Sequence, residues 1–113
     1  MAVIPLNTFR TIARNLTTTN EVVLYTCPAG VTAIVLLAQV ANVDALSTGR
    51  ITFMHVRQTT KTELVKNCPI PIEDARTMLT GRLVLEEGDR LNAVADAANK
   101  LKITLSVVES ANT

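Results

Sequence analysis

The chain has 113 residues and a mass of 12.2 kDa, which is enough for one domain but leaves no room for a second core. Apolar residues form 48% of it and its formal charge is +1, which excludes a disordered chain and a binder held to nucleic acid or membrane by charge. Aromatic residues form 3%, Trp is absent and His55 is the single histidine, so base stacking and acid–base catalysis lack the side chains they need.

The first seven residues, 1–7, contain Pro5 and are predicted to form a short extended arm. They lack the basic region and the apolar stretch of about 7–15 residues that define a signal peptide. No apolar run approaches the roughly 20 residues of a membrane span. We therefore expect a protein that is made and kept in a cytoplasm.

The rest of the chain alternates short runs of β-branched and aliphatic residues with turn signals, which predicts an all-β protein. The predicted strands cover residues 9–14, 21–26, 31–41, 50–57, 62–66, 90–95 and 101–108, and residues 75–80 and 82–85 flank Gly81. About eight strands in so short a chain predict a single-domain, two-sheet, jelly-roll-like β-sandwich over residues 1–113.

Residues 31–41 form the most ambiguous segment, because Ile34, Leu37, Ala38 and Ala41 would also line one face of a helix. The β-branched residues and the preceding turn favour a strand. Its unbroken apolar run indicates that both of its faces are covered, as around residues 83–85. A loop could provide that cover, but a neighbouring subunit is the simpler explanation.

Proline and glycine mark the turns and crossovers. A Pro-x-Gly sequence fits a tight turn, a Gly-Asp pair ends the acidic stretch 86–89, and two prolines near residue 70 predict an edge strand or a crossover. The structural positions predicted in this way are Pro28, Gly30, Pro69, Pro71, Gly88 and Asp89. Cys27 and Cys68 each precede a proline, and the sequence favours two reduced thiols while leaving a disulfide open.

Few side chains are candidates for chemistry. His55 shares a strand face with Ile51 and Phe53, and no Gly-x-Ser-x-Gly elbow supplies a nucleophile for it. We interpret His55 as a histidine that is hydrogen-bonded at a sheet face or a subunit contact. Residues 86–89 could form a weak calcium loop, but a turn explains them better. No catalytic, cofactor or metal site is predicted.

Four residues are candidates for contact with another subunit. Arg10 and Arg14 lie four apart on one strand and therefore share a face, which makes a small basic stripe suited to an acidic neighbour or simply to solvent. Val35 and Leu37 lie in the apolar segment whose second face needs cover.

Three segments, taken in order, resemble a known group of proteins. Residues 25–35 contain Thr-x-Pro-x-Gly before a long apolar strand, residues 68–71 are Cys-Pro-Ile-Pro, and residues 83–91 contain Leu-x-x-Gly-Asp. This pattern resembles small virion structural proteins of tailed bacteriophages, particularly T4-like myoviruses of marine cyanobacteria. Residues 5–14 and 105–110 are similar to the same group, so the resemblance covers nearly the whole chain.

The resemblance implies a non-enzymatic particle component that assembles in several copies. We expect a capsid decoration or cement subunit, with a neck, tail or baseplate component as the alternative and a receptor- or glycan-binding module less favoured. The expected partners are copies of the chain itself, with a trimer among the candidates, and a major capsid protein or tail proteins. No nucleic acid, membrane, cofactor or small-molecule substrate is expected. The expected location is the virion, after synthesis in the cytoplasm of a host bacterium.

Overall fold

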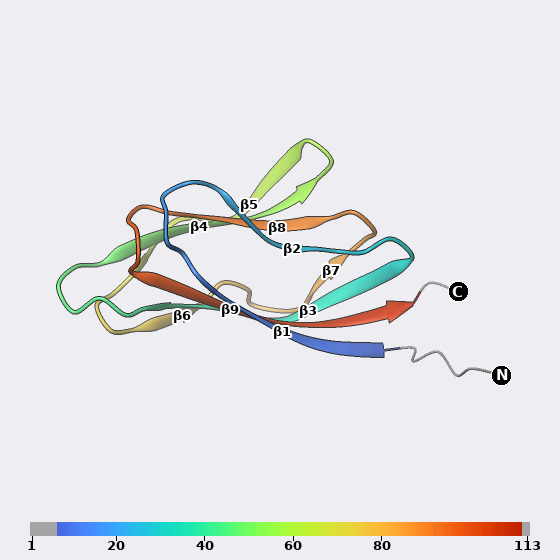
Figure 1. Cartoon of the computed structure of the whole chain (residues 1–113), viewed down its shortest axis with the longest axis horizontal. Coiled ribbons are helices and arrows are strands. Elements are labelled where there is room, and N and C mark those ends of the chain that lie inside the picture. The colour runs from blue at the N-terminus through green and yellow to red at the C-terminus, as the bar shows by residue number, and fades with distance from the viewer. Residues whose placement is uncertain (1–6, 112–113) are drawn as a thin grey trace.

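The computed structural model describes residues 7–111, which contain nine strands and no helix (Figure 1). All but Asn7 of the expected N-terminal arm lies outside the described residues. The strands are β1 (Asn7–Asn15), β2 (Val22–Thr26), β3 (Val31–Asn42), β4 (Gly49–Arg57), β5 (Thr60–Ile70), β6 (Ala75–Thr77), β7 (Leu83–Leu85), β8 (Arg90–Ala95) and β9 (Leu101–Ala111).

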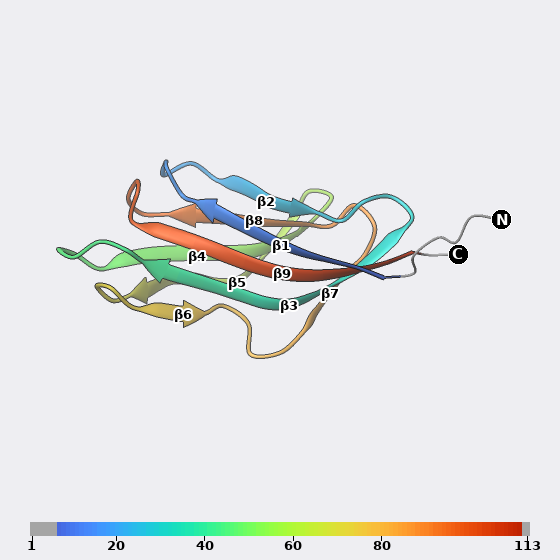
Figure 2. The ribbon, with the colours of Figure 1, turned by 60° about the horizontal axis from the view of Figure 1, so that its bottom comes forward.

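The strands form two antiparallel sheets that pack face to face (Figures 1 and 2). Sheet A has the order β1-β9-β3-β6, and β7 also pairs with β3. Sheet B has the order β2-β8-β4-β5. Because β9 occupies one edge of β3 along its length, β6 and β7 share the other edge and fill a single strand position. Eight positions in this order make a jelly roll, which confirms the predicted fold class.

Strand β3 settles the ambiguous segment as a strand, since it pairs with β9 from Val31 to Asn42. The pairing slips between Val35 and Leu37, where β3 contains an extra residue. Val35 points into the core before this bulge and Ala38 points into it afterwards. Leu36 in the bulge is 41% exposed, so no loop within residues 7–111 of the same chain covers the outer face of β3 at this point.

Strand β4 follows the predicted alternation. Ile51 and Phe53 belong to the core between the sheets, whereas Met54 and Val56 point to the opposite face and are also buried. Its neighbour β5 lies at the edge of sheet B. Pro69 is tolerated there because one side of an edge strand has no partner strand to which a backbone N–H must donate. The edge-strand prediction for this proline is confirmed.

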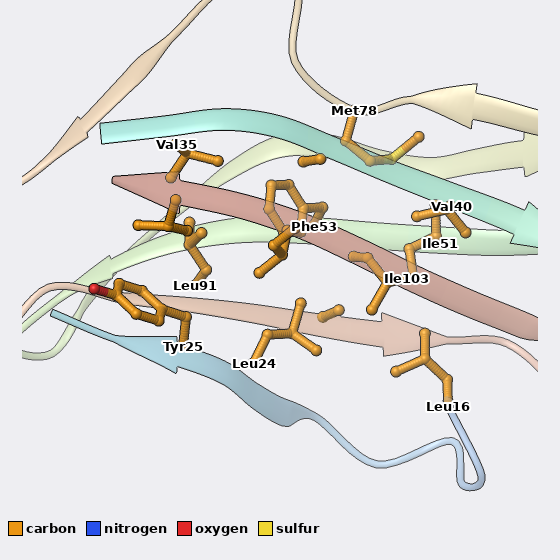
Figure 3. Packing of buried hydrophobic residues seen from close by; sticks show 14 of the residues in the cluster. Leu16, Leu24, Tyr25, Val35, Val40, Ile51, Phe53, Met78, Leu91 and Ile103 are labelled. Carbon is orange, nitrogen blue, oxygen red and sulfur yellow. The ribbon is translucent and has the colours of Figure 1, made fainter. Parts of the chain in front are cut away.

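The core lies between the two sheets and consists of aliphatic side chains around Phe53 (Figure 3). Leu91 contacts this cluster from sheet B and Ile103 from sheet A. Leu16, just after β1, is 1% exposed and is held by backbone hydrogen bonds to Leu101 and Asn99. Burial of this cluster is the main stabilising contribution, at about 1.5–3 kcal/mol for each large apolar side chain.

Candidate assembly surface

The outer face of sheet A carries a row of four apolar side chains. The register places Phe9 opposite Val108, Val108 opposite Ile34, and Ile34 opposite Val84, so one residue comes from each of β1, β9, β3 and β7. Residues paired in this way point to the same face. Phe9 is 74% exposed and Val84 is 54% exposed. We call these four residues the apolar row.

A shallow groove of about 470 Å³ is lined by three residues of this row, Phe9, Ile34 and Val108. Leu36 contributes to it because the β3 bulge turns this side chain outward, and Arg82 lies at its rim beside β7. Asn7 and Ser110, which pair with each other near the ends of β1 and β9, close the groove at one end. We call this feature the outer groove.

The apolar character is confined to one end of the face. Farther along the same strands, the register places Ala13 opposite Thr104, Thr104 opposite Gln39, and Gln39 opposite Thr77. That second row is small or polar and suits contact with water. A face that is polar at one end and exposes large apolar side chains at the other is typical of a protein–protein contact.

Of the two apolar candidates from the sequence, only one reaches this surface. Leu37 points to the outer face and is half-buried. Val35 is fully buried in the core, so its assignment to an interface is wrong. The residues that sequence reasoning missed are Phe9 and Leu36. Finding them requires the β1–β9 register and the β3 bulge, neither of which leaves a signal in the local pattern.

Arg10 and Arg14 do share a face, but it is the inner side of the β1 edge, since they pair with Val107 and Ile103. The Nε of Arg10 donates to Oε1 of Glu109 at 2.8 Å. The hydroxyl of Tyr25 donates to the other carboxylate oxygen at 2.5 Å. Arg10 therefore already has an acidic partner within the chain.

Glu109 is 7% exposed, so its charged carboxylate is stabilised mainly by these two donors and not by water. Burial by itself raises its pKa, but the hydrogen bonds from Arg10 and Tyr25 outweigh burial and bring the pKa below its ordinary value. Burial and the neighbouring Glu109 together raise the pKa of Tyr25. This group joins β9 to β1 and β2 just beneath the apolar row.

A second buried charge lies in the turn before β8. Asp89 is 1% exposed and accepts hydrogen bonds from His55 Nε2 at 2.9 Å and from Arg57 Nε at 2.9 Å and Nη2 at 2.8 Å. The backbone N–H of Glu86 donates to it at 2.9 Å. The paired contact from Arg57 is the main cause that holds the pKa of Asp89 well below its usual range.

These hydrogen bonds join β4 to the turn between β7 and β8. The side-chain hydrogen bond of His55 goes to Asp89. The expectation of a hydrogen-bonded histidine is confirmed, whereas its partner, 34 residues away, depends on sheet pairing that the sequence does not display.

The two predicted glycine turns lie side by side. Gly30 has φ of 74° and Gly88 has φ of 84°, as a tight turn requires. The backbone N–H of Cys27 donates to the Asp89 carbonyl at 2.8 Å, and that of Gly88 donates to the Cys27 carbonyl at 3.0 Å. The Glu87 carboxylate accepts from the Gly30 N–H at 2.7 Å. These bonds fix the two turns together.

The two thiols are both free, which resolves the question that the sequence left open. Cys27 is buried near the β2–β3 turn, and Cys68 is half-buried on β5. Within residues 7–111, no group of three or more His, Cys, Asp or Glu side chains is arranged to hold a metal ion. The described part of the chain also contains no helix long and apolar enough to cross a membrane.

Neither protein-family models nor curated protein sequences give a match to this chain. Solved structures do. A chain of the acid-stable capsid structure of Helicobacter pylori bacteriophage KHP30 matches with a TM-score of 0.60 and 17% identity, over 98% of this chain and 92% of that one. A chain of the Bacillus endospore appendages, which form disulfide-linked pili, matches with a TM-score of 0.56 and 10% identity, over 100% and 98%.

Both matches extend over nearly the whole of each chain, so the proteins share one complete β-sandwich and have similar lengths. At identities this low, the likeness establishes the fold. Both of these similar chains come from assemblies, one a phage capsid and the other a pilus.

Proposed function

We propose that this chain is a non-enzymatic structural subunit of a bacteriophage particle and that it decorates the capsid, where it associates with copies of itself and stabilises the shell. The match to a capsid chain of similar length supports the placement on a capsid. The resemblance of residues 25–35, 68–71 and 83–91 to small phage virion proteins supports a structural role in the particle.

The observation that carries this proposal is the apolar row. Phe9 and Val84 expose 74% and 54% of their surfaces on a sheet face whose other end is polar. Leaving such side chains in water costs roughly 25 cal/mol per Å² of apolar surface, and a neighbouring protein removes that cost. A single aromatic ring in the row gives little for stacking on a sugar, which weakens the case for a glycan-binding module.

Two alternative functions would use the same surface. A neck, tail or baseplate component of the particle would also bury the apolar row against protein. A subunit of an extracellular filament is favoured by one specific observation, the match over 100% of this chain to a pilus-forming protein. Such a filament would be built from head-to-tail contacts between copies of the chain.

Immunogold electron microscopy distinguishes these assignments. An antibody raised against the purified chain is applied to particles and to cell-surface fractions from the source that encodes it. We expect gold particles spread over the capsid shell, with many copies per particle when the same sample is quantified by mass spectrometry.

The matched control is particles treated with the antibody after absorption with the purified chain, which should carry no gold. Label confined to the tail or baseplate would replace the decoration role by the tail role. Label on filaments, or none on any particle, would overturn the proposal.

A further inference from the structure

The outer groove ends at Asn7, the first residue that the structure describes. The six residues that precede it, Met-Ala-Val-Ile-Pro-Leu, are all apolar. We propose that residues 1–6 of one copy lie in the outer groove of a neighbouring copy. This inference rests on the proposed function, because it names the partner that covers the apolar row within a self-associating subunit.

The composition of these residues fits the groove. In an extended chain, alternate side chains point the same way, so Ala2, Ile4 and Leu6 form one apolar edge. Pro5 falls between two of them, where the lack of its N–H removes one group that burial would leave unpaired. The residue before a proline also favours an extended conformation, which suits Ile4.

The length also fits. The apolar row crosses four strands, which makes three strand spacings of about 4.8 Å, or roughly 14 Å in all. Six extended residues span about 20 Å. Residues 1–6 are therefore long enough to cross the row from end to end.

The direction of β1 favours a neighbouring copy over the same chain. Asn7 pairs with Ser110, one residue before the end of β9, so the line of β1 leaves the sheet there (Figure 2). A return onto the same face would need a tight turn, which takes four residues and leaves two for the row. A neighbouring copy receives all six without a reversal of the chain.

A disulfide-trapping experiment tests this placement. Two full-length variants are made in a Cys68→Ser background: Ile4→Cys with a size tag, and Leu36→Cys without a tag. The two purified proteins are mixed and oxidised under mild conditions, and the products are separated on a non-reducing gel. We expect a band of one tagged and one untagged chain, since Leu36 lines the outer groove.

The matched control replaces Leu36→Cys by Leu46→Cys. Leu46 is 87% exposed and lies between β3 and β4, outside the outer groove, so its yield of mixed dimer should be at least tenfold lower. Equal yields from Leu36→Cys and Leu46→Cys would show that the cross-link reports random collision and would overturn the inference. So would an Ile4→Cys/Leu36→Cys double variant that cross-links only within one chain.

Sedimentation velocity gives a second, independent readout. Replacing both Ile4 and Leu6 by Ser removes two apolar anchors and should weaken self-association roughly tenfold for each anchor. Unchanged association would overturn the inference while leaving the capsid role in place. If the mixed dimer is trapped but the immunogold experiment finds no label on any particle, the placement of residues 1–6 is kept and the proposed function is overturned.

Discussion

Asp89 is the residue on which the local structure depends most. It is buried with a full charge, and it is stable there because Arg57, His55 and the Glu86 N–H satisfy its oxygens. Loss of its charge would weaken these hydrogen bonds at a buried position, whereas Arg57, whose side chain is 49% exposed, would keep its ion pair with Glu86.

We expect Asp89→Asn to lower the free energy of unfolding by about 1.5–3 kcal/mol, since it weakens the charged hydrogen bonds that Arg57 and His55 make to this side chain. Urea denaturation followed by far-UV circular dichroism measures this loss. The matched control is Glu63→Gln, an exposed carboxylate on β5, which should change the free energy by less than about 0.5 kcal/mol. Equal effects from the two substitutions would contradict the structural role of Asp89.

The same residue sets a pH dependence. Arg57 lowers the pKa of Asp89 in the folded protein, so its stabilising effect is complete above the unfolded pKa of about 3.9 and is lost as the pH falls below it. We expect wild type to exceed Asp89→Asn in stability at pH 7 and pH 5, with the difference shrinking below about pH 4. Urea titrations at these pH values test this, and a difference that persists unchanged to about pH 2 would contradict it.

Gly88 is a turn residue whose backbone conformation the sequence predicts. We expect Gly88→Ala to cost about 1–2 kcal/mol, because φ of 84° is unfavourable for any residue with a Cβ. Gly81→Ala is the matched control, since a Cβ meets nothing within 4 Å at either glycine and only Gly88 has positive φ. Thermal unfolding of both variants measures the two losses of stability, and equal losses would rule out backbone strain at Gly88 as the cause.

The chemistry of individual turns was therefore predictable and that of the Asp89 cluster was not. Pro28, Gly30 and Gly88 act through their own backbone preferences, which are visible in the sequence. His55 and Asp89 meet only because β4 and β8 are neighbours in sheet B, and nothing local to either residue fixes that pairing.

Among the strands, β1 and β4 show how the same residue type serves two purposes. Phe53 on β4 is 0% exposed at the centre of the core, and Phe9 on β1 is 74% exposed in the apolar row. The sheet register decides this difference. Phe9 pairs with the outward Val108, whereas Phe53 pairs with the buried Ala93.

We expect Phe53→Ala to lower the free energy of unfolding by about 3–5 kcal/mol through loss of buried contact and creation of a cavity. Phe9→Ala is its control and should change the stability of the dilute, dissociated protein by less than about 0.5 kcal/mol. Chemical denaturation at submicromolar protein concentration gives both values. A large loss from Phe9→Ala under these conditions would mean that its ring stabilises the single chain.

Strand β3 was predicted correctly in its type and bounds, but its bulge was not. Its β-branched composition correctly predicted a strand, and its bounds agree with the expectation to within one residue. The bulge at Leu36 reverses the inward and outward phase along the strand, so Val35 points into the core whereas Leu37, two residues later, points outward. A single inserted residue changes the pairing without changing composition, so the pattern alone does not reveal it.

In the whole molecule, the fold class can be predicted from the sequence, whereas the position of the assembly surface cannot. The fold class follows from strand density and turn spacing, and both are properties of the sequence. The assembly surface follows from register, because the apolar row takes one residue from each of four strands that are far apart along the chain. The apolar excess indicated that something must cover a strand face, and the structure locates that face on sheet A beside Asn7.

A cryo-electron microscopy map of particles from the source that encodes this chain tests the central claim most directly. We predict many copies of the β-sandwich on the capsid shell, each with Phe9, Val84 and the outer groove of sheet A buried against protein. The account would be contradicted by a map without this sandwich, or by one in which the outer face of sheet A is open to solvent in every copy.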